Sequence, residues 1–345
     1  MEEGRKEHFL KRKNIEFTVQ RYLIDAMSYM ALGLFASLIV GTILNTLGDK
    51  LGIVFFTDVL WPIAQKMTGP AIGVAVAYGL QAPPLVLFSS VLTGAAGGEL
   101  GGPVGAFLAA VVGAEFGKMV HKETKLDIIV TPAVTIILGV LMGRMAGPGV
   151  AALMTGLGEM IMYATTLQPI PMGIIISVLM GIILTLPISS AAIAIMLSLG
   201  GLAAGAATVG CCAQMIGFAV MSYRDNGMAG LLAQGLGTSM LQMPNIVRNP
   251  RVWIPPIVTS AILGPIATYV LKIENIPIGA GMGTSGLVGQ FGTIQAMEAI
   301  GRGGISLYLI ILLMHFILPA ILTLIIAGFL RRLGWIKDGD LKLDL

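Results

Sequence analysis

Charged residues are scarce in this sequence. Asp, Glu, Lys and Arg make up 11% of its 345 residues, whereas a soluble domain carries about 25%. The sequence holds three histidines and only two cysteines, Cys211 and Cys212, which stand side by side in an apolar run. Adjacent cysteines rarely bridge each other, and no metal-ligand spacing is present, so we expect both to be small packing residues and predict no metal site. The composition excludes an ordinary soluble domain.

The sequence also lacks the patterns of several function classes. It has no arrangement of nucleophile, base and acid, no phosphate-binding loop and no basic nucleic-acid-binding patch. We therefore predict no cofactor and no nucleic-acid partner, and we identify no catalytic residues. The first 21 residues are polar and charged, which is not the pattern of a cleavable signal peptide.

Apolar residues, in contrast, are abundant. Hydrophobic residues make up 56% of the chain, which also contains 46 glycines and 21 methionines. Glycine lets the backbones of membrane helices approach closely, and methionine fills irregular apolar spaces. This composition predicts an all-α polytopic membrane protein.

The apolar runs predict about ten transmembrane helices. They lie at about 22–46, 51–65, 70–93, 94–115, 126–147, 149–167, 173–199, 200–221, 252–271 and 305–330. A break is expected at Pro83-Pro84, and the glycine-rich fourth span is not expected to be a plain helix. Residues 22–330 thus form the predicted transmembrane domain, and residues 331–345 form a tail.

Positive charges predict the orientation of the chain. Six cations lie in residues 1–21 among apolar residues, a pattern that predicts an amphipathic helix on an anionic lipid surface. Further cations lie at 118–125 and at Arg331 and Arg332. Because Lys and Arg concentrate on the cytoplasmic side, we expect both termini to be cytoplasmic in a multi-pass protein of the cytoplasmic membrane.

One short motif occurs twice. Gly235-Leu-Gly-Thr-Ser239 recurs as Gly281-Met-Gly-Thr-Ser285, 46 positions later. Glycine and polar residues interrupt the apolar pattern around both copies, and irregular backbone is tolerated at membrane depth only where it is buried in protein or lines a cavity. Interrupted segments at matching positions are a pointer to a transporter's substrate site. We therefore predict two re-entrant hairpins, near 226–250 and 275–303, that enter from opposite faces; the alternative is two extramembrane loops with a chance match.

The predicted hairpins contain most of the candidate substrate-binding residues. Their hydroxyl and amide groups can donate and accept hydrogen bonds to a small polar solute, a sugar or a small carboxylate. The alternatives are helix capping by the hydroxyls and internal hydrogen bonding by the amides. The candidates are Thr238, Ser239, Gln242, Asn245, Thr284, Ser285, Gln290, Thr293 and Gln295.

Ionisable residues inside apolar runs are further candidates. Glu99 lies in the glycine-rich stretch 97–102 and is the preferred carboxylate for binding or proton coupling. Glu115 is expected to form a surface pair with Lys118. His315, inside the last span, is interpreted as a hydrogen-bonded packing residue, with a proton relay as the alternative.

A resemblance to a known family appears at Pro244-Asn-Ile-Val-Arg-Asn-Pro250, followed by Trp253-Ile-Pro-Pro256. This run resembles a segment of the EIIC membrane components of the phosphoenolpyruvate-dependent sugar phosphotransferase system, best in the glucose/chitobiose-type superfamily. It has one residue more before the Asn-Pro pair. The chain, and Gly281–Gly286 especially, is also similar to a single-domain EIIC-like family that includes the perfringolysin O regulator.

This resemblance implies a function and partners. It implies sugar transport in a bacterial inner membrane, a homodimer, separate IIA- and IIB-type partner proteins, and annotation as a protein-N(PI)-phosphohistidine–sugar phosphotransferase. EIIC components that phosphorylate sugar have a glutamate in the first hairpin, ahead of the Asn-Pro pair, where this chain reads Gly237-Thr-Ser-Met240. We therefore expect transport without the standard coupled phosphorylation; the alternative is a membrane-embedded solute sensor or regulator, which needs the same site.

Overall fold

The helical character predicted from the sequence is confirmed. The computed structural model describes residues 9–343, and within them helices form nearly all of the regular structure, with one isolated β-bridge between Gly201 and Asn275 and no strand. Arg5 and Lys6 of the predicted amphipathic helix lie outside the described residues. The chain divides into two units: unit 1 is Met1–Gly41 with Asp58–Leu153, and unit 2 is Thr42–Thr57 with Met154–Leu345.

Six helices within residues 9–343 have the length and apolar composition to cross a membrane. They are Gln20–Leu51, Gly101–Val120, Asp127–Thr165, Gly201–Met221, Pro250–Val270 and Ile305–Arg332. The shorter apolar helix Pro169–Thr185 accompanies them. These helices support a multi-pass membrane protein, while the count of ten spans and the opposed re-entrant hairpins remain predictions.

Unit 1 consists of a few helices, one of which folds back on itself. Its elements are η1 (Gln20–Ala26), α2 (Met27–Leu34), η2 (Phe35–Ile39), α4 (Trp61–Gly79), α5 (Pro84–Val120) and the first part of α6 (Asp127–Thr165). α5 begins at the predicted proline break. At Gly102 (φ 56°, ψ −148°) it turns, and Gly97 and Gly105 on the two arms approach so closely that a Cβ on either would meet the other's carbonyl oxygen. The glycine-rich fourth span predicted at 94–115 therefore contains this turn and lies on both arms of α5.

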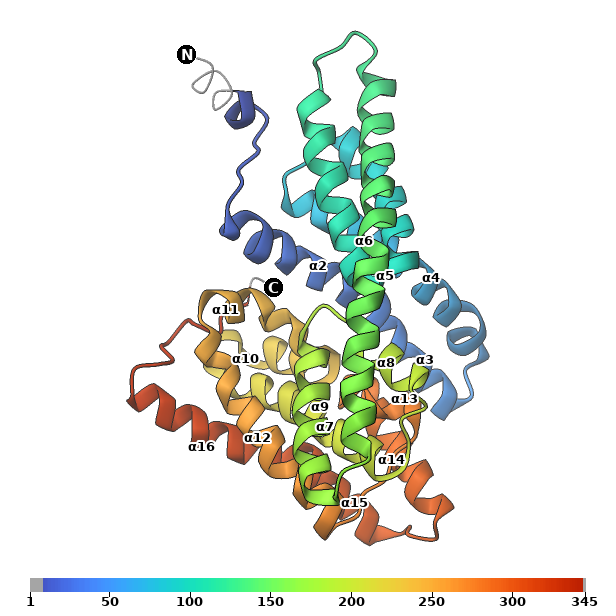
Figure 1. The fold of residues 1–345 in the computed structure, drawn as a ribbon, viewed down its shortest axis with the longest axis vertical. Coiled ribbons are helices and arrows are strands. Elements are labelled where there is room, and N and C mark those ends of the chain that lie inside the picture. The colour runs from blue at the N-terminus through green and yellow to red at the C-terminus, as the bar shows by residue number, and fades with distance from the viewer. Residues whose placement is uncertain (1–8, 344–345) are drawn as a thin grey trace. The chain divides into compact units, whose positions relative to one another are not determined.

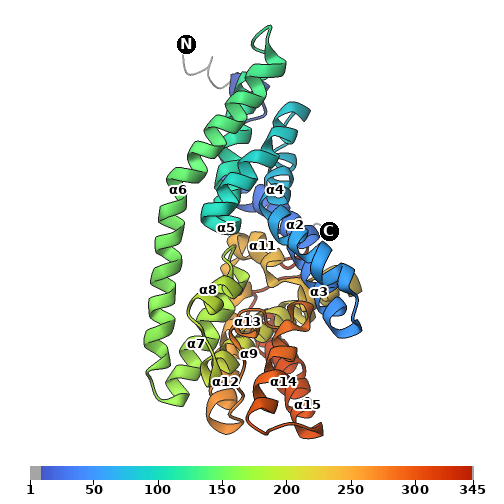
Figure 2. The same cartoon turned by 90° about the vertical axis from the view of Figure 1, so that its right-hand side faces the viewer.

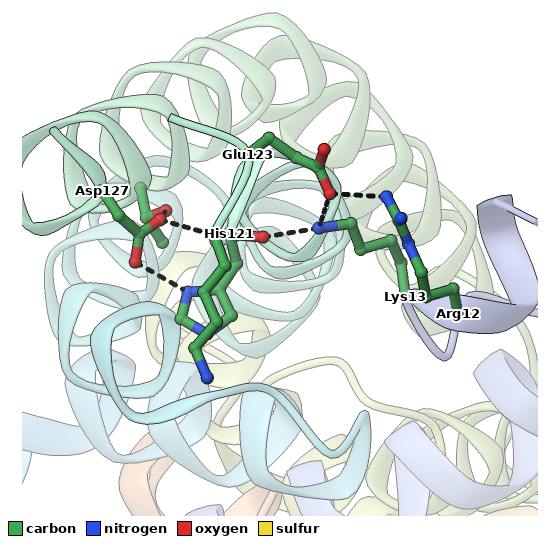
Figure 3. Close-up of polar contacts among 7 residues, drawn as sticks. Arg12, Lys13, His121, Glu123 and Asp127 are labelled. Atoms are coloured by element: carbon green, nitrogen blue, oxygen red, sulfur yellow. Dashed lines mark hydrogen bonds and ion pairs between the residues drawn. The ribbon is translucent and has the colours of Figure 1, made fainter. Parts of the chain in front are cut away.

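The N-terminal segment of unit 1 is fastened to the loop after α5 (Figure 3). Glu123 accepts contacts from Lys13 Nζ at 2.5 Å and Arg12 Nη2 at 2.7 Å, and the His121 ring lies 3.2 Å from the Asp127 carboxylate. These contacts hold the segment before the first spanning helix against the loop that the positive charges predict to be cytoplasmic.

Two predictions for unit 1 and α6 are wrong. Glu115 does pair with Lys118, at 2.9 Å, but the pair is buried rather than on the surface, because the arms of α5 pack against α2 and α4. The predicted fifth and sixth spans form one helix, α6, with Pro148 inside it. Proline and glycine are tolerated inside membrane helices, so the run 147–149 does not end this one.

Unit 2 contains the remaining elements. They are α3 (Val40–Leu51), η3 (Phe55–Leu60), the end of α6, α7 (Pro169–Thr185), α8 (Ser190–Met196), α9 (Gly201–Met221), α10 (Tyr223–Leu232), η4 (Ala233–Gly237), η5 (Ser239–Gln242), α11 (Met243–Arg248), η6 (Pro250–Trp253), α12 (Ile254–Pro265), η7 (Ile266–Val270), α13 (Pro277–Ala280), η8 (Ser285–Leu287), α14 (Val288–Ala299), α15 (Ile305–Leu312), η9 (Leu313–Ile317) and α16 (Leu318–Arg332).

Helix α9 is the centre of unit 2. It packs against α7, α12 and α16, and Figures 1 and 2 show α9 near α7 and α12. Most side chains of α9 are buried. Small residues allow this packing: a Cβ at Gly205 would meet the carbonyl oxygen of Ile273, and one at Gly210 would meet that of Ser177. The core around α9 therefore brings backbones, rather than long side chains, into contact.

Candidate functional site

Both copies of the Gly-x-Gly-Thr-Ser motif lie in irregular backbone of unit 2: the first is in the short helices η4 and η5, and the second is in the turn between α13 and the start of η8. In the first, Thr238 is extended (φ −157°) and separates η4 from η5, and its Oγ1 accepts a hydrogen bond from the Met240 amide. In the second, Gly283, Gly286 and Leu287 all have left-handed φ near 50–60°. Glycine adopts this conformation without strain, which explains two of the three positions. The sequence prediction of interrupted backbone holds at both copies.

The two copies touch each other. The Thr284 hydroxyl donates a hydrogen bond of 2.5 Å to the carbonyl oxygen of Gly235, although 49 residues separate the two. Both copies also contact α9. A Cβ at Gly235 of the first copy would lie 3.5 Å from the Ala219 side chain, and in the second copy the Thr284 hydroxyl is 3.5 Å from the Met215 sulfur. One face of α9 therefore supports the point where the motifs meet.

A buried polar cluster surrounds Ser239. Its Oγ lies 2.8 Å from the hydroxyl of Thr185, on α7, and that hydroxyl is 3.2 Å from Gln214 Oε1, on α9. The indole of Trp253 donates to the same Gln214 oxygen at 2.9 Å. The Gln214 Nε2 group is buried and has no hydrogen-bond partner among the described residues. An amide donor without a partner is thus held beside the first motif.

A second buried cluster lies beside the second motif. Gln290 Nε2 is 3.1 Å from His315 Nδ1 and 3.5 Å from the Cys212 sulfur. Within the part of the chain that the structure describes, Gln290 Oε1, His315 Nε2 and Ser285 Oγ are buried without a hydrogen-bond partner. Buried polar groups are nearly always paired, so each orphan needs an explanation. A polar solute or water can supply the missing partners.

The other predicted residues lie elsewhere. Thr293 donates to the Gly289 carbonyl within its own helix, at 2.9 Å, and Gln295 is exposed. Glu99 is exposed and belongs to unit 1. Gln242 and Asn245 are buried but bonded to each other, at 2.8 Å, and to main-chain carbonyls of residues 341 and 342. Four candidates, Ser239, Thr284, Ser285 and Gln290, therefore lie at the motif contact or in the two clusters.

Charge is absent from the buried polar side chains described for unit 2. These side chains belong to Ser, Thr, Asn, Gln and one His, and they include every side chain of the two clusters except the half-buried Trp253 and the buried Cys212. In residues 9–343, no group of three His, Cys, Asp or Glu side chains is placed to hold a metal ion. The site is therefore built from neutral donors and acceptors.

Sequence reasoning did not single out Thr185, Gln214 or Trp253. Gln214 had a signal, because it is a lone amide inside the apolar helix α9, and intramembrane polar residues are functional candidates. Thr185 had none, and Trp253 was part of the run that resembles the family but was given no role, because only the fold brings these two residues to the same glutamine. His315 was interpreted as a hydrogen-bonded packing residue, and its Nδ1 atom does contact Gln290.

Comparison with known proteins gives one match. A family model described as "Phosphotransferase system, EIIC" matches residues 24–343. No curated protein and no solved structure matches the chain. The family match covers both units and both copies of the motif.

Proposed function

Since the chain belongs to the EIIC family of the phosphotransferase system, we propose that it moves a neutral sugar across the cytoplasmic membrane, and that the sugar binds where the two Gly-x-Gly-Thr-Ser motifs meet. The family and the apolar helices support a membrane transporter of this type. The observation that carries the position of the site is the bond between Thr284 and Gly235, with orphan polar atoms on either side of it.

The orphan atoms suit a hydroxyl-rich ligand. Gln214 Nε2 is a donor, Gln290 Oε1 is an acceptor, and Ser285 Oγ and His315 Nε2 can be either. A sugar hydroxyl both donates and accepts, so it can partner all four. Trp253 adds an apolar ring edge beside the first cluster, fixed by its bond to Gln214.

Neutrality favours a sugar over a small carboxylate. An anion taken into a buried site needs a cation or several donors to replace its hydration. No Lys or Arg side chain described in unit 2 is buried. A neutral polyol makes no such demand, so the charge distribution supports the sugar of the two solutes that the sequence left open.

Transport is proposed to proceed without the standard coupled phosphorylation. Residues 226–250 contain no Asp or Glu, so the family's hairpin glutamate has no counterpart there. In membranes supplied with phosphoenolpyruvate, general components and IIA- and IIB-type partners, we expect no sugar phosphate that depends on this chain. Chain-dependent sugar phosphate would refute this part of the proposal.

The finer architecture belongs to the same proposal. Two opposed hairpins, cytoplasmic termini and a homodimer are expected from the family resemblance and the Lys and Arg clusters. Cysteines at positions 10 and 340 of a Cys-free variant should resist an impermeant thiol reagent in intact cells. Labelling of either without lysis would overturn the orientation.

The central experiment is uptake by proteoliposomes. We expect a labelled neutral sugar, from a panel that includes small carboxylates, to accumulate inside vesicles containing the chain. Gln290→Ala should weaken uptake, whereas Gln295→Ala, an exposed amide on the same helix, serves as the matched control. Sugar binding without uptake would favour the sensor, and accumulation of carboxylates alone would refute the proposed solute.

A further inference from the structure

Residues Trp335–Leu343, here called the strap, follow α16 and lie against residues 226–250, here called motif segment 1. Two apolar side chains anchor the strap, Ile336 and Leu341, which are 2% and 0% exposed. Between them the chain makes a turn, in which Asp340 Oδ2 accepts the Lys337 amide at 2.8 Å and Gly339 takes φ 89°. An apolar residue is therefore held at each end of a preformed turn.

Side-chain amides of motif segment 1 hold the strap by its main chain. Leu341 O accepts from Asn226 Nδ2 at 2.8 Å and from Gln242 Nε2 at 3.0 Å. Lys342 O accepts from Asn245 Nδ2 at 2.9 Å. Asn226 also accepts the Leu343 amide, at 2.8 Å. These contacts bind main-chain groups of residues 341–343, next to the buried side chain of Leu341.

The side-chain amide of Asn249 binds the turn of the strap. Asn249 Nδ2 donates to the Asp340 carboxylate at 2.8 Å and to Trp335 O at 3.0 Å. Asp225 accepts the Gly339 amide at 3.2 Å, and the Arg251 guanidinium lies 5.2 Å from the centre of the Trp335 ring. Motif segment 1 and its two flanking residues, Asp225 and Arg251, therefore contact the strap from Trp335 to Leu343, as a peptide-binding surface contacts a ligand.

The strap uses groups that would otherwise face another ligand. The two N–H groups of Gln242 Nε2 donate to Leu341 O and Gln234 Oε1. The two N–H groups of Asn245 Nδ2 donate to Lys342 O and Gln242 Oε1. If the strap leaves, each amide loses one acceptor. The strap itself has few hydrogen bonds of regular secondary structure, which is typical of segments that open locally.

We propose that motif segment 1 carries a peptide-binding site, that the strap occupies it reversibly, and that release of the strap frees the segment that bears the first Gly-x-Gly-Thr-Ser motif. The site takes a peptide that has two apolar residues five positions apart, with an acidic residue directly before the second apolar residue. In the strap these residues are Ile336, Leu341 and Asp340. The regulatory part rests on the proposed function, while the binding site does not.

Thiol labelling in detergent tests the binding site without any solute. Leu341→Cys places a thiol at the buried anchor, and Asp338→Cys places one on a side chain that is 90% exposed. The unaltered chain is the background, because Cys211 and Cys212 are fully buried. We expect labelling at 341 to be about tenfold slower than at 338, the protection given by a closed local structure.

Competition distinguishes a reversible occupant from a fixed part of the fold. An excess of a synthetic peptide with the sequence of residues 335–343 should raise the rate of thiol labelling at position 341, while a scrambled peptide should not. The double substitution Asn226→Ala and Asn245→Ala should also raise the labelling rate at position 341, and the labelling rate at position 338 should stay the same. Equal rates at 341 and 338, or protection that neither the peptide nor the substitutions alter, would overturn the proposal.

A second variant covers failure of Leu341→Cys to fold. A chain that ends after Leu333 should bind a fluorescently labelled peptide with the sequence of residues 335–343. The full chain should bind the same peptide more weakly, because its own strap occupies the site. Loss of uptake from both chains with peptide binding intact would count against the proposed transport alone. Absence of peptide binding to the folded, shortened chain would count against the strap alone.

Discussion

The two units bury different kinds of polar group. In unit 1, Arg21, Glu115 and Lys118 are buried, with 9%, 5% and 2% of their surfaces exposed. In unit 2, the buried polar side chains that the structure describes are all neutral. Both interiors are made of apolar helices, so the contrast lies in what each unit does with its polar groups.

The buried charges of unit 1 are used for fastening. Lys118 Nζ lies 2.9 Å from Glu115 and donates to Asn14 O at 2.8 Å and to Leu80 O at 3.1 Å. Arg21 donates to the same Leu80 carbonyl, at 2.7 Å. Leu80 follows α4, and cations are favourable at the C-terminal end of a helix. Buried atoms without a hydrogen-bond partner occur in both units, and Arg21 Nε and Tyr22 Oη are examples in unit 1. Those at the motifs of unit 2 belong to neutral amide, hydroxyl and imidazole groups, which suits the binding of a neutral polar solute.

The largest effect is expected from breaking the buried pair of unit 1. Lys118→Met leaves the Glu115 carboxylate buried without its partner, which costs about 3–5 kcal/mol of stability. Thermal unfolding in detergent measures the loss. Glu115→Gln combined with Lys118→Met should recover most of it, because no unpaired charge remains, and failure to recover would show that the pair is not what stabilises this region.

The next effect tests the contact between the motifs in unit 2. Thr284→Val removes the hydroxyl and leaves the Gly235 carbonyl without its donor, at a cost of about 1–3 kcal/mol. Both the unfolding temperature and solute affinity should fall. Unchanged stability and affinity would mean that the contact neither joins the motifs nor shapes the site.

Ser285→Ala separates binding from folding. The Ser285 hydroxyl has no hydrogen-bond partner in the described chain, so its removal should leave the unfolding temperature unchanged. If the solute supplies the partner, losing about 1–3 kcal/mol weakens sugar binding several-fold to about a hundredfold. Titration with the transported sugar measures this, and unaltered affinity would remove Ser285 from the site.

Two glycine turns compare the units directly. Gly102 of unit 1 and Gly283 of unit 2 both have positive φ, but a Cβ at Gly102 meets open space, whereas one at Gly283 meets Cys211 at 2.8 Å. Gly102→Ala should therefore cost about 1–3 kcal/mol of backbone strain, because its φ and ψ lie in a region restricted almost entirely to glycine. Gly283→Ala should cost more, because its Cβ also meets Cys211. Gly149→Ala, in a helix with open space around it, is the control and should not destabilise. The unfolding temperatures of the three variants, measured in detergent, should fall in the order Gly149→Ala, Gly102→Ala, Gly283→Ala, with the last the lowest.

The smallest effect is a pH dependence in unit 1. Contact with Lys13, and then with Arg12, lowers the pKa of Glu123 below its ordinary value (Figure 3). The folded form therefore gains stability from the ionised carboxylate above the unfolded pKa of about 4.3, and this gain is lost as the pH falls through the lower folded pKa. Unfolding temperatures of the protein and of Glu123→Gln should differ slightly at pH 7 and converge near pH 3. If the difference in unfolding temperature were the same at both pH values, the charge of Glu123 would not contribute to stability.

Local sequence patterns predicted the irregular parts of the chain better than its long-range contacts. The repeated glycines marked both motifs, because glycine at left-handed φ and polar residues in an apolar run are signals within a few residues. The pairs Gln290–His315 and Gln214–Trp253 are 25 and 39 residues apart, and only helix packing brings them together. The same limit applies to α6, where Gly147-Pro148-Gly149 resembles a break but the surrounding helix continues.

Two glycines of α9 fix the position of this helix along its axis. Gly205 and Gly210 let the backbones of Ile273 and Ser177 lie directly on the helix, while Val209 and Cys211 beside them carry full side chains. Sliding α9 by one residue would bring a side chain to a place where only a hydrogen fits, and packed cores do not deform continuously. Such a helix has one register against its neighbours and cannot act as a piston. Helix α9 is therefore a fixed support for the two copies of the motif that contact it.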